Sequence, residues 1–416
     1  MTYDNALEYI HSFLKFGSKP GLERILALLE KLGNPQKNLR IVHVAGTNGK
    51  GSTSTMLSEI FRADGKKTGL FTSPYIIDFC ERIQIDNEMI PHEKLAALTE
   101  KIKPIVEELN SNGIEPTEFE IITAMAFDYY YQENCDIVVL EVGLGGLLDS
   151  TNVIEKPLAS VITSISFDHT DILGNTLTEI AQQKCGIIKD DSITVAYPLQ
   201  DLQVIREIRK TAKEKNNSLV VPDLSLMEIE ECSFEKTVVK YKGEQFTLRL
   251  FGEHQIYNML TAVETALSLG VSVQSIQKGV ENTAIPARVE FLNSKTLLDG
   301  GHNESGTQMM AKVLSLFEGN TVVVSMMADK DVENSVKNLS TNTKVMIATE
   351  CSNPRAMKAE KLGAICSKFC AKVYVFKNPF EAIDKAIEEN DGNLLAVCGS
   401  LYLASEVREY LKNKIK

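Results

Sequence analysis

The 416-residue chain carries 44 Lys and Arg against 56 Asp and Glu, for a net charge of -12, and 44% of its residues are hydrophobic. This is an ordinary globular composition with core material for two domains, and its acidic balance excludes general affinity for nucleic acid or an anionic membrane. No apolar run reaches membrane-helix length, the N-terminus lacks a secretion signal, and the eight cysteines show no CxxC or zinc-ligand spacing, which predicts a cytoplasmic protein with reduced thiols.

Short apolar runs typical of buried strands alternate with segments of helical spacing, such as residues 53–62. The clearest strand-like runs are 41–45, 137–142, 159–165, 296–299, 321–327, 344–348, 372–376 and 394–398. Residues 223–251 differ, because alternating polar and apolar residues around Lys242-Gly243 predict an antiparallel hairpin flanking the first sheet. The pattern predicts an α/β protein of two domains, residues 1–292 and 293–416, with parallel sheets covered by helices.

The segment GTNGKGS, residues 46–52, lies between a predicted strand and a predicted helix. Glycines let the backbone approach a phosphate, and the N–H groups that open a helix point at it. Lys50 would reach the β- and γ-phosphates, and a following hydroxyl would face Mg²⁺. The strict G-x-x-x-x-G-K-[ST] pattern is not met, because Val44 stands at its first Gly and Gly51 follows the Lys. The alternative is a tight turn capped by Ser52.

Polar residues follow the next two strands, at the sheet edge where α/β proteins bind ligands. Glu141 ends one predicted strand, and Asp168 and His169 follow another. A buried carboxylate needs a partner, and a metal ion would serve, although Mg²⁺ prefers oxygen ligands to histidine. The alternatives are that Glu141 caps a helix and that His169 is a structural histidine.

A further segment, DGGHNESG, follows the predicted strand at 296–299. It brings Asp299, His302 and Asn303 to a strand end in the second domain. A plain helix N-cap is the simpler explanation of this segment.

In this order the pieces resemble the Mur ligase superfamily and, within it, the folylpolyglutamate synthase/dihydrofolate synthase family. The resemblance runs through PGLERILALLEKLGNP, HVAGTNGKGS, TSPYIIDFCERIQI, EVGLGGLLDSTN, SFDHTDILGNTLTEIA, QKCGIIK, GEHQIYN, PARVE, DGGHN, DKD and GSLYL. It implies an N-terminal P-loop ATPase-like domain with a parallel sheet, which binds ATP, and a C-terminal Rossmann-like α/β domain of the glutamate-binding type.

The resemblance also implies an ATP and metal site. The ATP phosphates would lie on Lys50 and the loop residues Gly46, Thr47, Asn48, Gly49, Gly51 and Ser52. Mg²⁺ would be bound by Ser73, Glu141 and His169, and a second Mg²⁺ by Lys184 after its carbamylation with CO₂. The nucleotide would also meet Asn258, Arg288 and Asp299, and His302 would approach the phosphates.

The substrate residues follow from the same resemblance. Phe119 and Glu120 match the pterin-side stretch, and their alternative is a half-buried helix start. For glutamate, Arg82, Lys330 and Arg355 offer positive charge, and each reads equally well as a surface residue.

Four positions, in three motifs, depart from the family pattern. Leu147 replaces an Arg of EVGLGGRLD, which removes a polar contact. Lys184 is flanked by Gln183 and Cys185 where the family commonly has EKAGI, which weakens the carbamate assignment. Glu304 replaces a Pro and affects helix entry.

The implied activity is an ATP-dependent ligase that adds L-glutamate to a folate, as a monomer acting on small molecules. Whether dihydropteroate is also a substrate is left open. One alternative is a muramyl-peptide amino acid ligase, which usually has an extra domain before the phosphate loop. The other is a P-loop kinase or regulatory NTPase, which would not need the second domain.

Overall fold

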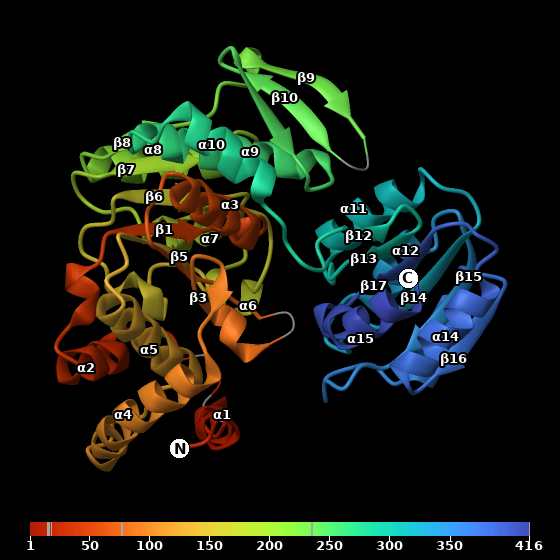
Figure 1. The fold of residues 1–416 in the computed structure, drawn as a ribbon, viewed down its shortest axis with the longest axis horizontal. Coiled ribbons are helices and arrows are strands. Elements are labelled where there is room, and N and C mark those ends of the chain that lie inside the picture. Colours follow the sequence, from red (N-terminus) through yellow and green to blue (C-terminus); the bar gives the residue numbers. More distant parts are fainter. Residues whose placement is uncertain (15–16, 18, 76–77, 234–235, 416) are drawn as a thin grey trace. The chain divides into compact units, whose positions relative to one another are not determined.

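The computed structural model describes residues 1–14, 17, 19–75, 78–233 and 236–415, and they form two compact units (Figure 1). The first comprises Met1–Arg249 and Glu253–Thr283, and the second comprises Leu250–Gly252 and Ala284–Lys416. The expected boundary between residues 292 and 293 would cut strand β12 (Glu290–Asn293), which pairs with β13 of the second unit. The division therefore falls earlier. None of the described helices is long and apolar enough to cross a membrane.

The first unit is built on an eight-stranded sheet of order β4-β3-β2-β5-β1-β6-β7-β8. The strands from β2 to β8 in this order are parallel, whereas β3 pairs antiparallel with β2, and the edge strand β4 pairs antiparallel with β3. The strands are β1 (Ile41–Ala45), β2 (Thr68–Phe71), β3 (Ile83–Ile85), β4 (Glu88–Met89), β5 (Ile137–Glu141), β6 (Ala159–Ile162), β7 (Ile193–Ala196) and β8 (Ser218–Val220). The predicted strands at 41–45, 137–142 and 159–165 are confirmed, the last two with shorter ends.

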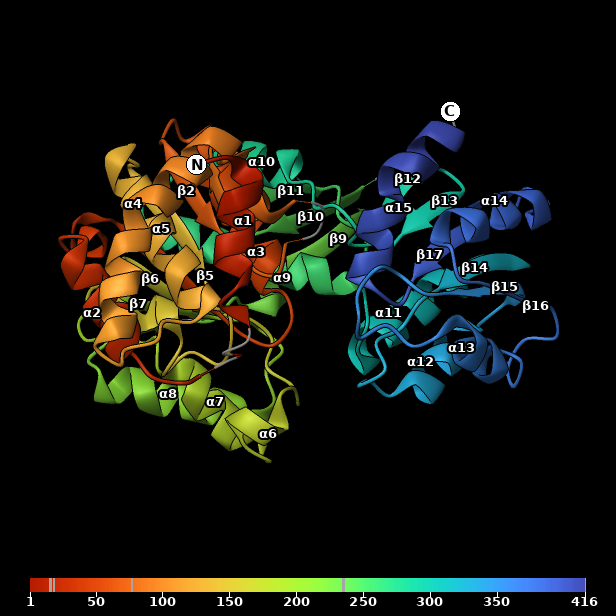
Figure 2. The same cartoon turned by 90° about the horizontal axis from the view of Figure 1, so that it is seen from below.

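Helices cover both faces of this sheet (Figure 2). One face carries α3 (Lys50–Ala63), α9 (Glu253–Ser268) and α10 (Val273–Asn282). The other buries apolar side chains of the remaining helices in two clusters. Those helices are α1 (Tyr3–His11), α2 (Glu23–Lys31), α4 (His92–Ser111), α5 (Glu118–Gln132), α6 (Thr170–Leu173), α7 (Leu177–Cys185) and α8 (Leu202–Glu214). As its spacing predicts, α3 buries Met56, Leu57, Ile60 and Phe61.

The predicted hairpin at 223–251 is part of a separate antiparallel sheet of order β11-β10-β9. Its strands are β9 (Met227–Cys232), β10 (Thr237–Tyr241) and β11 (Glu244–Leu248). The turn at Lys242 (φ 52°) and Gly243 (φ 86°) has both residues left-handed, as a two-residue hairpin requires. These strands form a sheet of their own and do not join the first sheet. Its apolar face packs on α10.

The second unit has a six-stranded sheet of order β12-β13-β17-β14-β15-β16, parallel except for β12. Its strands after β12 are β13 (Thr296–Leu298), β14 (Asn320–Val324), β15 (Thr343–Thr349), β16 (Val373–Phe376) and β17 (Leu395–Cys398). Its helices are α11 (Glu304–Leu314), α12 (Val332–Leu339), α13 (Ala359–Cys366), α14 (Pro379–Glu389) and α15 (Leu401–Lys414). Buried clusters on both faces make this the predicted Rossmann-like layer structure.

Candidate active site

Four parallel strands of the first unit end at the same edge of the sheet. These are β2, β5, β1 and β6, in that spatial order. The chain leaves β1 to form β2 on one side and later returns to form β6 on the other, so the strand order reverses at β1. Ligands of open α/β sheets bind at such a reversal, beyond the carboxyl ends of the strands. The segment that follows β1 is the predicted phosphate loop.

Two glycines of this loop have backbone conformations that other residues rarely adopt, Gly46 (φ 156°) and Gly49 (φ 86°). A Cβ added at Gly46 would lie 1.8 Å from Thr163 Oγ1, and one at Gly49 would lie 2.3 Å from Asn258 Oδ1. The loop is also tied to the segment after β6, because the N–H of Thr47 donates to Ser164 O at 2.8 Å. The backbone is therefore held in a tight turn that brings its N–H groups to the sheet edge.

The helix after the loop begins at Lys50, earlier than the predicted start at residue 53. Its N-cap is Gly49, and no side chain caps it. The alternative in which Ser52 caps the turn is therefore wrong, and Ser52 Oγ instead accepts a hydrogen bond from Gln255 Nε2 at 3.3 Å. A helix N-terminus of this kind, with uncapped N–H groups, favours an anion such as phosphate.

Two lysines converge on the loop. Lys50 Nζ donates to Thr47 O at 3.2 Å, and the buried Lys184, in the last turn of α7, donates to Gly46 O at 2.8 Å. Burial and the charge of Lys50 lower the pKa of Lys184 to about 7, although Asp168 and Asp149 act in the opposite direction. Near neutral pH a large fraction of Lys184 is therefore an uncharged amine.

Glu141, the last residue of β5, faces the same loop. Its side chain is buried, and its Oε2 accepts a hydrogen bond from the N–H of Ser73 at 3.2 Å. A Cβ added at Gly51 would lie 3.7 Å and 3.9 Å from the two carboxylate oxygens, an ordinary contact. The structure thus gathers the Glu141 carboxylate, the Ser73 segment and the first turn of α3.

His169 is placed differently. It has φ 47° and ψ 42° and precedes the short helix α6. Its Nε2 lies 3.8 Å from Asp168 Oδ2, and 51% of its side chain is exposed. The structure therefore keeps His169 on the segment after β6, at the correct edge, but does not bury it with Glu141.

Asn258 lies beneath the glycine turn. Its side chain is 2% exposed on α9, its Oδ1 faces Gly49, and its Nδ2 donates to Gln255 Oε1 at 3.1 Å. Because Gln255 in turn donates to Ser52, these amides fasten α9 to the phosphate loop.

The two pterin-side candidates, Phe119 and Glu120, have different surroundings. The Phe119 ring is half-buried against Gly143, where an added Cβ would lie 2.6 Å from Phe119 Cζ. Glu120 is 1% exposed and forms a capping box with Thr117, and Arg24 pairs with it at 3.1 Å. These contacts explain Glu120 as part of the helix start, which was its alternative interpretation.

Arg82 is less exposed than a free surface residue. Its guanidinium lies 5.2 Å from the ring centre of Tyr75 and 5.5 Å from that of Phe79. The two other glutamate candidates, Lys330 and Arg355, lie in the second unit after β14 and β15.

Sequence analysis did not single out Asp149, which the structure buries beside the EVGLGG turn. Its Oδ2 accepts from the N–H of Leu144 at 2.8 Å, and its Oδ1 accepts from Thr151 Oγ1 at 2.5 Å. Burial raises the pKa of Asp149 despite these hydrogen bonds. The sequence does contain a pattern that could have indicated this role. Asp149 follows a glycine turn and precedes Ser-Thr-Asn, and such residues favour hydrogen bonds between side chains and the nearby backbone.

In the second unit, the DGGHN segment follows β13. Asn303 is the N-cap of α11, accepting from Gly306 N, so the N-cap explanation is correct for that residue. Asp299 is buried and accepts from the N–H groups of Val289 at 3.0 Å and Gly301 at 2.8 Å. Burial raises the pKa of Asp299, with Arg288 opposing it. His302 Nδ1 lies 3.0 Å from Gly300 O.

Arg288 lies between two left-handed residues that are not glycine, Ala287 (φ 53°) and Val289 (φ 48°). Such conformations cost about 1 kcal/mol or more each and persist where neighbouring contacts enforce them. Here Asp299 holds the Val289 N–H, and Glu290 Oε2 holds the Ala287 N–H at 2.9 Å. Glu290 is itself held by Arg408 of α15, with Nε 3.0 Å from Oε2.

Changing Arg408 to Ala is expected to lower the free energy of unfolding of the second unit by about 2 kcal/mol at pH 7, because Glu290 would stay partly buried without its cation. Burial raises the pKa of Glu290, but the Arg408 and backbone hydrogen bonds outweigh it and hold the pKa below its usual value. The pair therefore stabilises the fold above about pH 4.3, the ordinary glutamate pKa, and this contribution is lost as pH falls through the folded-state pKa.

Urea unfolding at neutral and acidic pH measures this difference. Lys414→Ala on the same helix, which removes a more exposed ion pair with Asp384 at 2.8 Å, is the matched control and should change little. A difference between Arg408→Ala and the unchanged protein that is the same at both pH values would contradict the assignment.

The comparisons with known proteins agree with this geometry. Residues 44–266 match the Mur ligase middle domain, and residues 287–401 match the Mur ligase, glutamate ligase domain. The chain is 38% identical to the dihydrofolate synthase/folylpolyglutamate synthase of Bacillus subtilis over 99% of both chains. Its fold is similar to that of the folylpolyglutamate synthase of Thermotoga maritima (TM-score 0.89, 33% identity, 99% of this chain and 97% of the other). It is also similar to the Mycobacterium tuberculosis folylpolyglutamate synthase solved with ADP and AMPPCP (TM-score 0.88, 28% identity, 98% and 99%).

A phosphate loop at the reversal point of a parallel sheet, followed by a second α/β unit, defines a nucleotide-binding ligase of the Mur type. Because the similarity to its relatives extends over the full length of the chain, the family within this class is also defined. The chain belongs to the folylpolyglutamate synthase/dihydrofolate synthase family. The kinase alternative is not supported, because the second domain matches the ligase family along most of its length.

Proposed function

We propose that this chain is an ATP-dependent ligase that joins L-glutamate to a folate through an amide bond, and that it also accepts dihydropteroate. The supporting observation is the arrangement at the end of β1, where an uncapped helix N-terminus, two lysines and a buried carboxylate surround one glycine turn. The names of the relatives support the choice of substrates.

The reaction has two steps. A carboxylate of the folate attacks the γ-phosphate of ATP, which forms an acyl phosphate and releases ADP. The amine of L-glutamate then attacks the acyl carbon, so the C–N bond forms, phosphate leaves and the amine loses a proton. Because the first step brings an anion to an anion, charge neutralisation and positioning dominate it.

The residues of the first unit have distinct parts in this scheme. The N–H groups of residues 46–52 and the Lys50 ammonium bind and orient the phosphates. Asn258 and Gln255 keep the loop in its shape. The Phe119 ring lies against the turn after Glu141, which suits it to contact a flat pterin ring.

Ser73, Glu141 and His169 are the residues that would hold Mg²⁺. Glu141 fits this role, because a carboxylate buried against the first turn of a phosphate-binding helix suits a hard cation. When bound, the ion supplies neutralisation of the phosphate charge. A second ion is proposed beside Lys184 once its amine carries a carbamate, and the pKa of about 7 supports this, since only the neutral amine reacts with CO₂.

A direct assay tests the proposal. The purified protein with Mg-ATP, tetrahydrofolate and labelled L-glutamate is expected to form a glutamylated folate together with equal amounts of ADP and phosphate. A parallel reaction with dihydropteroate measures the second activity. ADP formation that does not depend on glutamate, or ligation of a muramyl peptide but not of a folate, would overturn the proposal.

A further inference from the structure

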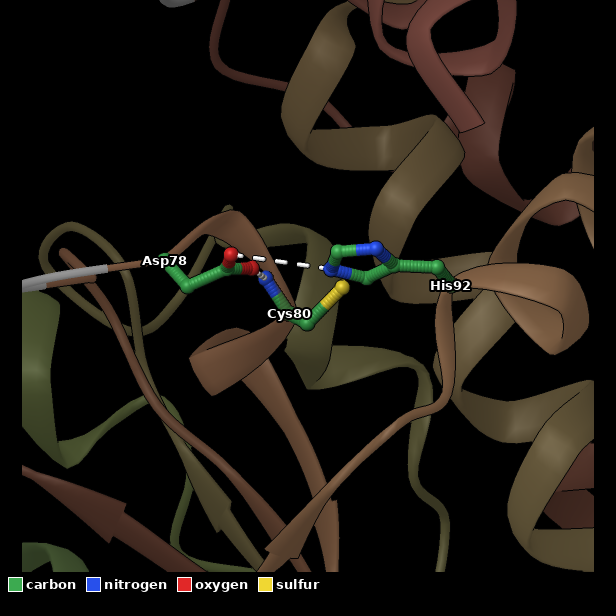
Figure 3. A group of neighbouring side chains, drawn as sticks. All are labelled: Asp78, Cys80 and His92. Atoms are coloured by element: carbon green, nitrogen blue, oxygen red, sulfur yellow. Dashed lines mark hydrogen bonds and ion pairs between the residues drawn. The ribbon is translucent and has the colours of Figure 1, made fainter. Parts of the chain in front are cut away.

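A second group of metal-ligand side chains lies in the first unit, outside the candidate active site. It consists of Asp78, Cys80 and His92 (Figure 3). Asp78 and Cys80 stand at the start of a 3-10 helix, Phe79–Arg82, and His92 is the first residue of α4. One ligand atom from each of the three lies within 4.8 Å of the others. The spacing of these residues in the sequence matches no metal motif, so only the fold brings them together.

Tyr3 on α1 holds two of these side chains in place. Its hydroxyl donates to Asp78 Oδ1 at 3.2 Å, and its ring stacks on the His92 ring with centres 3.6 Å apart and planes at 2°. Cys80 Sγ lies 3.8 Å from the same hydroxyl. Groups that orient ligands from outside the first shell are a regular feature of metal sites.

Asp78 presents its second carboxylate oxygen to His92 in a long ion pair. Oδ1 accepts from the Cys80 N–H at 2.7 Å, which caps the 3-10 helix. Oδ2 faces His92 Nε2 at 3.7 Å, which is too long for a hydrogen bond. Roughly 3.3–3.7 Å is the separation of two ligand atoms on a tetrahedral Zn²⁺, given metal–ligand bonds of about 2.0–2.3 Å.

The donor types select the metal. A thiolate, an imidazole and a carboxylate are ligands for Zn²⁺, whereas Mg²⁺ and Ca²⁺ prefer oxygen alone. The His92 side chain is 55% exposed, so a fourth position open to water is available. We propose that Asp78, Cys80 and His92 form a Zn²⁺ site with water as the fourth ligand, which joins the loop before β3 to α4.

The binding step releases one proton. A cysteine thiol is mostly protonated near neutral pH before a metal binds it. On binding, the S–H bond breaks, a Zn–S bond forms, and the proton passes to solvent. No electron transfer is involved, and the site does not depend on the proposed ligase activity.

Cobalt titration tests the proposal without an activity assay. The reduced, metal-free full-length protein is titrated with Co²⁺ in the presence of excess Mg²⁺, which occupies oxygen-rich sites. We expect absorption bands of tetrahedral Co²⁺ together with a thiolate-to-cobalt band, at one equivalent, and their loss when Zn²⁺ is added. The absence of a thiolate band in the unchanged protein would overturn the proposal.

Single variants assign the ligands. Cys80→Ser should remove the thiolate band, and Cys80→Ser and His92→Ala should each weaken Zn²⁺ binding at least about tenfold. Asp78→Asn keeps an oxygen that can cap the 3-10 helix and should weaken binding without unfolding the protein. Cys232→Ser is the matched control, because Cys232 is an exposed thiol elsewhere. A thiolate band that survives Cys80→Ser and is lost in Cys232→Ser would contradict the site.

Discussion

Replacing Lys50 by Ala is expected to reduce the rate of ligation about 100- to 1,000-fold while the protein stays folded. Lys50 opens α3 next to two glycines, and its ammonium already lies on the loop, 3.2 Å from Thr47 O. The attack of a carboxylate on the γ-phosphate concentrates negative charge there, and no other group of residues 46–52 carries a positive side chain. The loss should therefore fall mainly on the rate and not on folate binding.

Initial rates at varied ATP and folate, with circular dichroism as the check on folding, measure this effect. Lys50→Arg keeps the charge but changes its shape, and is expected to retain part of the activity. Lys210→Ala is the matched control, because Lys210 is an exposed lysine on α8. Activity of Lys50→Ala within a few-fold of the unchanged protein would remove the loop lysine from the mechanism.

Strands β1, β5 and β6 of the first unit follow from the sequence, and the reason is local. The run 41–45 is buried on both faces, so it is apolar except for the buried His43, and the glycines after it favour a turn. The same reasoning did not find the other five strands of the sheet, β2, β3, β4, β7 and β8. β3 and β4 have only three and two residues, which is too short for an apolar period to be detected.

The site was predictable in its parts but not in its contacts. Glu141 and the phosphate loop could be assigned from strand ends, whereas the depressed pKa of Lys184 depends on burial and on Lys50, more than 130 residues away in the chain. The approach of Asn258 to Gly49 could not be predicted from the sequence either, because it results from the packing of α9 on α3. Asp78, Cys80 and His92 could not be grouped from spacing at all, because α4 brings His92 to the other two.

Lys184 is expected to make the activity depend on dissolved CO₂. The departures Gln183 and Cys185 weakened this assignment from sequence, but the structure supplies its chemical requirement, a buried amine whose pKa of about 7 leaves it partly neutral. The neutral amine attacks CO₂, a C–N bond forms and one proton leaves, so a neutral amine becomes an anionic carbamate. Protein freed of CO₂ should lose most of its activity and regain it with bicarbonate.

A labelled carbamate provides a readout apart from activity. With ¹³C-bicarbonate, the unchanged protein is expected to show one carbamate carbon signal by NMR. Lys184→Arg, which keeps a positive charge but cannot form the carbamate, should lack the signal, ligate about 100-fold more slowly or worse, and not respond to bicarbonate. Lys189→Arg is the matched control, since burial also lowers the pKa of Lys189 but Lys50 is not among the causes. A signal that disappears in Lys189→Arg and persists in Lys184→Arg would assign the carbamate to Lys189. Full activity in the absence of CO₂ would exclude a catalytic carbamate.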